Sequence, residues 1–141
     1  MKKYLITSFL ALAMLFVAQQ GLSQNVTLSA DSVKLQCGQS GTVIVPIRVS
    51  NFTNIGSVDF TFGWDMQYLT YKYITGFGPE FTGLSNVFAA FDTTATNINQ
   101  GQFTSTWSRF GGHTIASNDV EFISVVFEYN GLGPAAISFL N

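Results

Sequence analysis

The stretch at residues 55–74, IGSVDFTFGWDMQYLTYKYI, decides the fold. In its first half the large apolar side chains fall at every second position, Val58, Phe60 and Phe62. The positions between them are small or polar: Ser57, Asp59, Thr61 and Gly63. A period of two with one apolar face is typical of a strand half-buried in an antiparallel sheet. The exposed row of Ser57, Asp59 and Thr61 is the surface that we expect the protein to use.

A second strand follows after a polar turn at residues 65–67. Leu69, Tyr71 and Tyr73 share one face of this strand, which we predict to face the core, and Thr70 and Lys72 share the other. We expect the rest of the chain to supply strands that cover the apolar face of the pair.

The composition of the 141-residue chain indicates one all-β domain. Only 10% of the residues are charged and 15% are aromatic, including 14 Phe, which argues against disorder. The 13 Gly and the many β-branched residues favour strands joined by turns. The formal net charge of −2 gives no electrostatic reason to bind nucleic acid.

Residues 1–23 have the pattern of a secretory signal peptide. Lys2-Lys3 precedes an apolar run at residues 5–17, and the small residues Gly21 and Ser23 suit cleavage before Gln24. The apolar run is shorter than the roughly 20 residues that a transmembrane helix needs. We therefore predict a secreted, extracellular protein whose mature domain spans residues 24–141, with no membrane contact after cleavage.

Seven further segments have strand patterns, separated by turns and by polar loops at residues 75–86, 93–101 and 110–119. They are residues 25–28, 31–36, 42–50, 87–92, 102–109, 120–129 and 135–140. Pro46 lacks a backbone donor, so its strand should be an edge strand or bulged there. The pattern predicts an all-β, antiparallel jelly-roll β-sandwich of about 8–9 strands. The sequence stops at a strand, so we expect it to be truncated, with the closing strand and any cell-surface attachment beyond residue 141.

The order of these segments resembles the cohesin family, the modules that bind dockerins in cellulosome-type assemblies. The resemblance covers residues 26–140 and lies in CGQSGTVIVPIRVSN (37–51), in residues 55–69, in FTSTWS (103–108) and in DVEFISVVFEYNGLGPAAISF (119–139). Met66 stands where the family usually has Pro, and Val120-Glu121 where Gly is usual. These departures leave the subtype and the partner specificity open.

The resemblance implies a non-catalytic jelly-roll module without a cofactor, one sheet of which docks a dockerin-type domain in a polysaccharide-degrading assembly. Calcium would be carried by the dockerin. A face of small polar groups suits such a contact, because it can meet a partner through hydrogen bonds around an apolar centre. By position in the family pattern, with Thr61 added from the exposed row, the predicted partner-binding residues are Ser57, Asp59, Thr61, Thr104, Thr106 and Arg109.

No set of residues suits catalysis or a bound metal. His113 is the single histidine, and a zinc site needs about four ligands, typically Cys and His. The spacing of the acids does not match a calcium loop: Asp59, Asp65, Asp92, Asp119 and Glu121. Cys37 is the single cysteine, so no intrachain disulfide forms; a buried apolar role, a free thiol and a bridge to another chain stay open.

Two other functions stay open, a carbohydrate-binding module of the same fold and a structural spacer of a larger surface protein. Carbohydrate binding needs coplanar exposed aromatics, for which the candidates are Trp64, Tyr68, Tyr71, Tyr73 and Trp107. Tyr71, Tyr73 and Trp107 fall on predicted core faces. Trp64 and Tyr68 are too few for a platform.

We expect export of the full chain to yield a protein that begins at Gln24, give or take one residue. Intact mass and amino-terminal sequencing of the exported protein check this. Recovery of a protein that retains residues 1–23 would contradict the prediction and indicate an uncleaved anchor.

Overall fold

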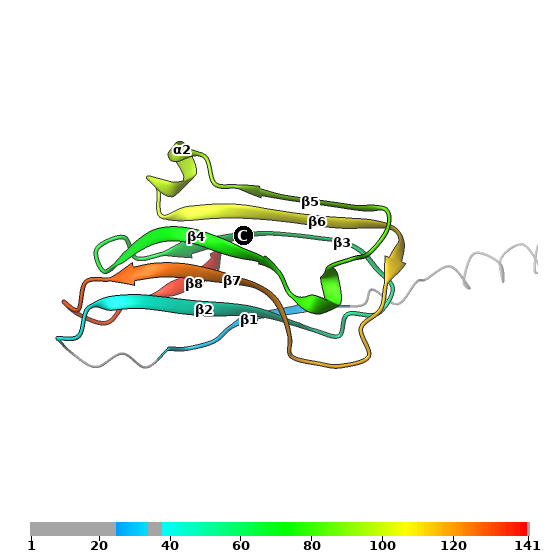
Figure 1. Cartoon of the computed structure of the whole chain (residues 1–141), viewed down its shortest axis with the longest axis horizontal. Helices are drawn as coiled ribbons and strands as arrows, with labels where there is room; N and C mark the ends of the chain where they lie inside the picture. Colours follow the sequence, from blue (N-terminus) through cyan, green and yellow to red (C-terminus); the bar gives the residue numbers. More distant parts are fainter. Residues whose placement is uncertain (1–24, 34–37, 141) are drawn as a thin grey trace, which may run out of the picture.

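Two antiparallel β-sheets pack face to face in the computed structural model, which describes residues 25–33 and 38–140 (Figure 1). The first sheet has the strand order β1 (Thr27–Ala30), β2 (Gly41–Ser50), β7 (Val120–Tyr129), β4 (Leu69–Phe77). The second has the order β5 (Val87–Asp92), β6 (Gln102–His113), β3 (Ile55–Trp64), β8 (Ile137–Leu140). The 3-10 turn η1 (Pro79–Phe81) follows β4, and the short helix α2 (Ala95–Ile98) joins β5 to β6. The predicted all-β jelly-roll sandwich is confirmed.

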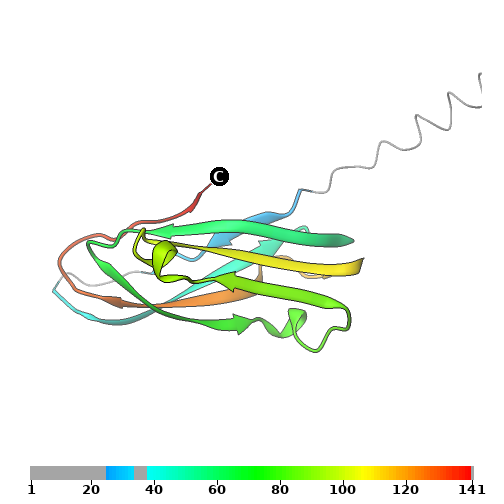
Figure 2. The ribbon, with the colours of Figure 1, turned by 90° about the horizontal axis from the view of Figure 1, so that it is seen from above.

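The two strands of residues 55–74 both form, but they lie in different sheets. β3 pairs with β6 and β8, whereas β4 pairs with β7 (Figure 2). The turn between them is held by Asp65, whose carbonyl accepts from the backbone N–H of Leu69 at 2.9 Å and whose side chain accepts from that of Gln67 at 2.9 Å. The expectation that the strands form one pair with a shared apolar face is therefore wrong. Their inward faces meet across the core, where the rings of Trp64 and Tyr71 stack at 5.7 Å.

The core fills the space between the two inner faces. Val58, Phe60 and Phe62 of β3 are all buried, as the alternation predicts. From β6, the predicted inward row is also buried and consists of Phe103, Ser105 and Trp107. The largest fully buried side chains come from both sheets and from the loops between them: Trp107, Phe52, Phe62, Phe103, Phe122 and Phe127. Burial of this aromatic surface is the main favourable term that holds the sheets together.

Bulges in β7 and β4 change which side chains face the core. Ile47 pairs with Ile123 and Arg48 with Glu121, so Phe122 is an extra residue in β7. The bulge turns Phe122 inward against Phe77 and Phe81, with ring centroids 5.1 and 4.7 Å away, and its neighbour Ile123 is fully buried as well. Pro46 pairs in register with Ser124, so the alternative of a bulge at Pro46 is wrong. β2 lies inside its sheet, but β1 pairs only with residues Ile47 to Ser50 of β2, so Pro46 lies just beyond the end of β1, where its carbonyl accepts from the N–H of Asp31 at 3.0 Å.

The bulge in β4 corrects a predicted core position. Tyr71 pairs with Phe127 and Tyr73 with Val126, which leaves Lys72 as the extra residue. Tyr73 therefore faces outward and is 57% exposed, while Ile74 packs against the core in its place. The prediction that Tyr73 lies in the core is wrong for this reason.

Several element boundaries differ from the predictions. The first strand is β1, shifted by two residues, and the described part of 31–36 contains no strand. β4 and η1 occupy part of the predicted loop at 75–86, α2 lies in the loop at 93–101, and β6 continues into the loop at 110–119. The predicted signal peptide and Cys37 lie outside the described residues. No helix in the described part of the chain is long and apolar enough to cross a membrane.

Replacement of Phe122 tests the bulge in β7. We expect Phe122→Ala to lower the free energy of unfolding by about 3–5 kcal/mol, because it removes a fully buried ring and leaves a cavity. Phe88→Ala is the matched control, since Phe88 is 61% exposed and its loss should cost less than about 0.5 kcal/mol. Urea denaturation measures both. Equally small losses of unfolding free energy in the two variants would place Phe122 on the outer face and contradict the bulge.

Candidate partner-binding face

Five of the six predicted site residues lie on the outer face of the second sheet. The strands β3, β6 and β5 align their outward side chains in three rungs. The rungs are Ser57–Ser108–Phe88, Asp59–Thr106–Ala90 and Thr61–Thr104–Asp92. These nine residues are hereafter the docking face. Because the pairing brings residues from three distant segments side by side, the face is continuous.

The docking face is polar at its centre and bears only negative charge. The hydroxyls of Thr61 and Thr104 lie 3.2 Å apart and hydrogen-bond across the strands. Asp92 ends β5, and one of its carboxylate oxygens accepts from the backbone N–H of Thr94 at 3.2 Å in the turn before α2. Asp59 is exposed and makes no side-chain hydrogen bond or ion pair within residues 25–33 and 38–140. The face therefore offers an unpaired carboxylate and no cation.

Arg109 does not share this face. Its guanidinium donates to the carbonyls of Ser85 and Gly112, each at 3.3 Å, and to Nδ1 of His113 at 3.0 Å. Since arginine only donates, Nδ1 of His113 is the acceptor, and the Nε2–H group donates to the carbonyl of Glu80 at 3.0 Å. Arg109 and His113 thus hold together the loop at residues 85–86, the turn at Glu80 and the end of β6.

The prediction from sequence missed the apolar part of the face. Phe88 on β5 is 61% exposed, and Leu140 on β8 is 41% exposed beside Thr61. Leu140 lies over Gly63, where an added Cβ would come within 2.9 Å of its side chain. The stretch VFAAFD has apolar residues at both parities, so alternation did not reveal which of them face outward.

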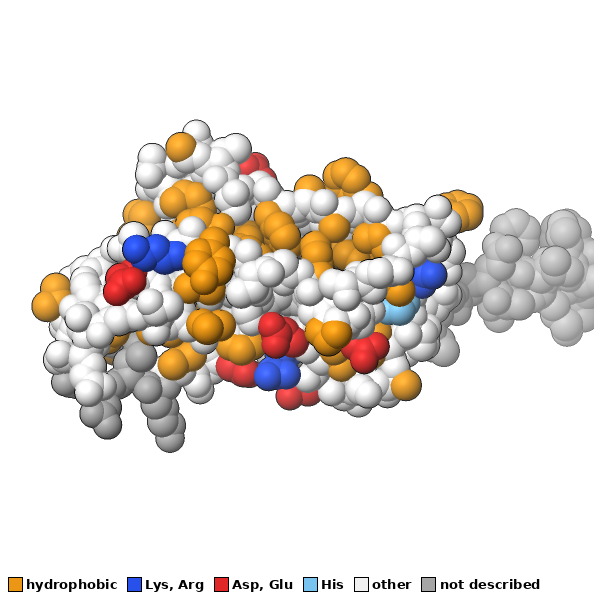
Figure 3. Space-filling view, in the orientation of Figure 1, with side chains coloured by type: hydrophobic (Ala, Val, Ile, Leu, Met, Phe, Trp, Pro, Cys, Tyr) orange, Lys and Arg blue, Asp and Glu red, His pale blue; other side chains and the backbone are white. Residues whose placement is uncertain are grey.

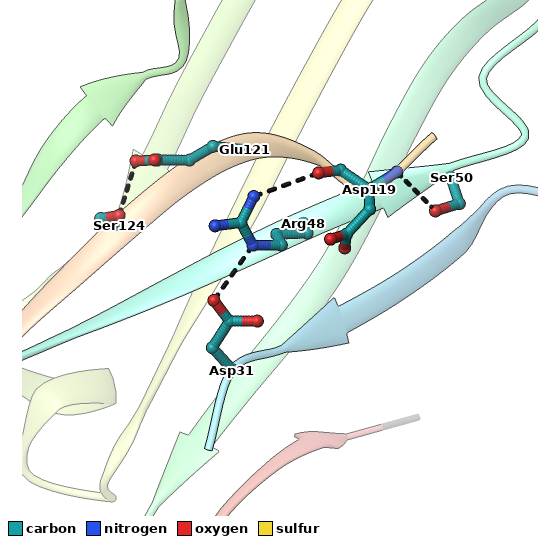
Figure 4. A network of polar contacts seen from close by, with 6 residues as sticks. All are labelled: Asp31, Arg48, Ser50, Asp119, Glu121 and Ser124. Carbon is teal, nitrogen blue, oxygen red and sulfur yellow. Dashed lines mark hydrogen bonds and ion pairs between the residues drawn. The ribbon is translucent and has the colours of Figure 1, made fainter. Parts of the chain in front are cut away.

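The basic residues that the structure describes on the opposite side of the sandwich are paired. On the outer face of the first sheet, Lys72 and Glu128 form an ion pair at 3.8 Å. Arg48 donates to the carboxylate of Asp31 at 3.0 Å and to the carbonyl of Asp119 at 3.1 Å (Figure 4). The hydrogen bond to Asp31 raises the pKa of Arg48 above its ordinary value. Figure 3 shows small groups of neighbouring acidic and basic side chains on this side. Asp59 on the docking face has no such neighbour.

The candidate aromatics do not form a sugar-binding platform in the described residues. Trp107 is fully buried, Trp64 is 8% exposed, and Tyr71 packs on Trp64. Burial raises the pKa of the Tyr71 hydroxyl. Tyr68 is half-buried against Gly133, which leaves Tyr73 exposed without a coplanar aromatic ring beside it.

The acids and the histidine do not converge. Among residues 25–33 and 38–140, no three His, Cys, Asp or Glu side chains lie close enough to hold a metal ion. Asp65 and Asp119 are turn residues, the latter with a φ of 59°. What the docking face can do chemically is donate and accept hydrogen bonds, attract a cation and bury a partner's apolar side chain.

Comparison with solved structures identifies the fold. The sixth cohesin of scaffoldin B from Acetivibrio cellulolyticus, solved with a dockerin, is 21% identical, with 82% of each chain covered and a TM-score of 0.62. A type I cohesin–dockerin complex from Clostridium thermocellum is 17% identical, covers 81% of this chain and 80% of the other, and has a TM-score of 0.60. A non-cellulosomal cohesin from the archaeon Archaeoglobus fulgidus is 16% identical, covers 82% and 78%, and has a TM-score of 0.55.

No protein-family model matches the chain, and no curated protein matches it either. The structural likenesses establish that the chain has the cohesin fold.

The contacts of Arg109 predict the effect of its removal. We expect Arg109→Met to speed amide hydrogen exchange at residues 85–86 and 112–114 by about tenfold, because these loops lose their shared donor. Lys72→Met is the control, since the exposed Lys72–Glu128 pair lies on the other sheet. Mass spectrometry measures the hydrogen exchange. Unchanged exchange in Arg109→Met would contradict the role of Arg109 in holding these loops.

Proposed function

We propose that this protein is a secreted, non-catalytic binding module whose docking face binds a dockerin-type domain in an extracellular, polysaccharide-degrading assembly. The observation that carries the proposal is the three-rung face, which presents small polar groups, an unpaired carboxylate and exposed apolar side chains in one plane. Two of the similar structures are complexes of a cohesin with a dockerin, which supports this class of partner.

The chemistry of the face suits a protein partner. The backbone groups of β6 are already paired with both neighbouring strands, so a partner meets the face through side chains. The polar centre is made of short side chains, which lose little conformational entropy on binding. Phe88 supplies an exposed ring of the kind that anchors interfaces. Calcium, in this proposal, belongs to the partner.

Non-catalytic action and secretion rest on separate features. Both ring nitrogens of His113 are engaged by Arg109 and Glu80, so the single histidine is not placed as a free base. The basic, apolar and small-residue pattern of residues 1–23 supports export.

Capture experiments test the class of partner. The exported protein is immobilised and exposed to the secreted proteins of the source organism, with and without a calcium chelator. We expect specific proteins with dockerin domains to bind in calcium and to be released by chelator. Capture that is unchanged by the chelator would contradict a dockerin partner. Retention of this protein on insoluble polysaccharide, with no captured protein, would indicate a carbohydrate-binding module.

Matched double variants test the face. We expect Asp59→Lys with Thr104→Trp to weaken binding of the captured dockerin on the order of 100-fold or more, because a charge is reversed and a bulky ring stands on the flat face. The control, Glu128→Lys with Thr42→Trp, makes the same two changes at paired positions on the outer face of the first sheet. Calorimetry gives the affinities, and thermal unfolding confirms that both variants fold. A larger loss in the control would move the interface to the first sheet.

A further inference from the structure

β5 is an edge strand at the end of its sheet farthest from β8. It pairs only with β6, and no other strand of the described residues lies beside it (Figure 1). Ala89 and Ala90 are both exposed, although their side chains point to opposite faces of the sheet. The free edge of β5 is therefore open to solvent at its centre.

The pairing with β6 shows which backbone groups of β5 are free. The N–H of Phe110 donates to the carbonyl of Asn86 at 3.3 Å, just before β5 begins. Since the direction of these groups alternates along an antiparallel strand, the even-numbered residues of β5 also point their N–H and C=O groups toward β6. The odd-numbered residues point theirs away from it: Val87, Ala89 and Phe91. No hydrogen bond to another segment engages these three residues within residues 25–33 and 38–140.

β5 lacks the features that keep an edge strand from pairing further. Its sequence, VFAAFD, has no Lys, Arg, Pro or Gly, and its pairing with β6 has no register shift. The other edge strands that the structure describes differ in this respect. β4 has two register shifts and contains Lys72 and Gly76, and β1 and β8 are only four residues long. Among the described strands, β5 is thus the one long, regular edge without such protection.

We propose that β5 pairs antiparallel with β5 of a second copy of this chain. The two-fold symmetry and the positions of the free groups together fix the register. Only with Ala89 opposite the second copy's Ala89 do all three free residues face free residues, because Val87 and Phe91 then lie opposite each other. The three pairs make six hydrogen bonds between the copies. This self-complementarity is the reason for choosing a second copy over any other extended chain.

The side chains also fit this register. On the outer face, the exposed ring of Phe88 lies opposite the second copy's Ala90, so a large side chain meets a small one. The Asp92 carboxylates lie at opposite ends of the pairing, which keeps the like charges apart. Phe91 stacks on Phe77 of β4 at 5.0 Å, so the edge is ordered before it pairs. The pairing joins the docking faces of the two copies into one continuous surface.

Sedimentation velocity of the exported protein, from about 10 µM to about 1 mM, tests the pairing. We expect a monomer–dimer equilibrium with a dissociation constant of about 10–100 µM, the range that six ordinary hydrogen bonds support. Ala89→Lys places like charges opposite each other at the symmetry axis and should weaken the dimer about tenfold or more. Thr42→Lys adds the same charge at an exposed position of β2, inside the first sheet, and should leave the dimer within about twofold.

Amide hydrogen exchange tests the edge directly. Between about 20 µM and about 1 mM protein, exchange should slow about fivefold at Val87, Ala89 and Phe91, whereas the even-numbered amides of β5 are already paired with β6 and should not change. A monomer at about 1 mM, equal weakening by the two lysine variants, or a dimer without this alternating protection would overturn the proposal. Protection of the same amides only when a dockerin domain is added would assign the edge to that partner and overturn pairing with a second copy. The dimer forms without a dockerin, so its failure leaves the proposed function in place.

Discussion

The alternation along β3 is the constraint on which the rest of the structure depends. Every second side chain from Val58 to Phe62 is buried against the other sheet, so a slip of one residue would expose these rings to water. The same constraint fixes Ser57, Asp59 and Thr61 on the outer face. β6 repeats the arrangement with Phe103 and Trp107 inside and threonines outside, and the two strands pair rung by rung. The docking face is therefore a direct consequence of how the core is packed.

The two outer faces of the sandwich differ in whether their charged side chains include ion pairs. On the first sheet, Arg48 and Lys72 each form an ion pair with an acidic residue. On the second sheet, Asp59 and Asp92 form no ion pair within the described residues. An exposed, unpaired carboxylate contributes little to stability, but it gains a charge-assisted contact when a cationic partner arrives. We therefore favour the second sheet as the surface that meets other molecules.

Most of the fold follows from the sequence because the strands of residues 42–50, 55–64 and 120–129 carry strong patterns and turn residues at their ends. The pairing of those strands does not follow, since periodicity shows which side chains share a face and not which strands are neighbours. The two strands of residues 55–74 were therefore predicted to pair with each other, but they lie in facing sheets. The bulges at Lys72 and Phe122 each shift the alternation by one residue, and no residue in the sequence marks where the shift occurs. Five candidate site residues came together because they sit on regular strands. Arg109 lies in β6 where its pairing with β3 becomes irregular, and its contacts depend on loops that no local pattern specifies.

The most direct test of the docking face is a cross-saturation experiment on the labelled protein bound to an unlabelled, calcium-loaded dockerin domain. Saturation of the dockerin's aliphatic protons reports which amides of this protein lie at the interface. We expect the strongest signal losses at residues 57–61, 88–92 and 104–108, on the three rungs of the second sheet. Losses concentrated at residues 42–48 and 124–128 would place the partner on the first sheet and contradict the assignment of the docking face.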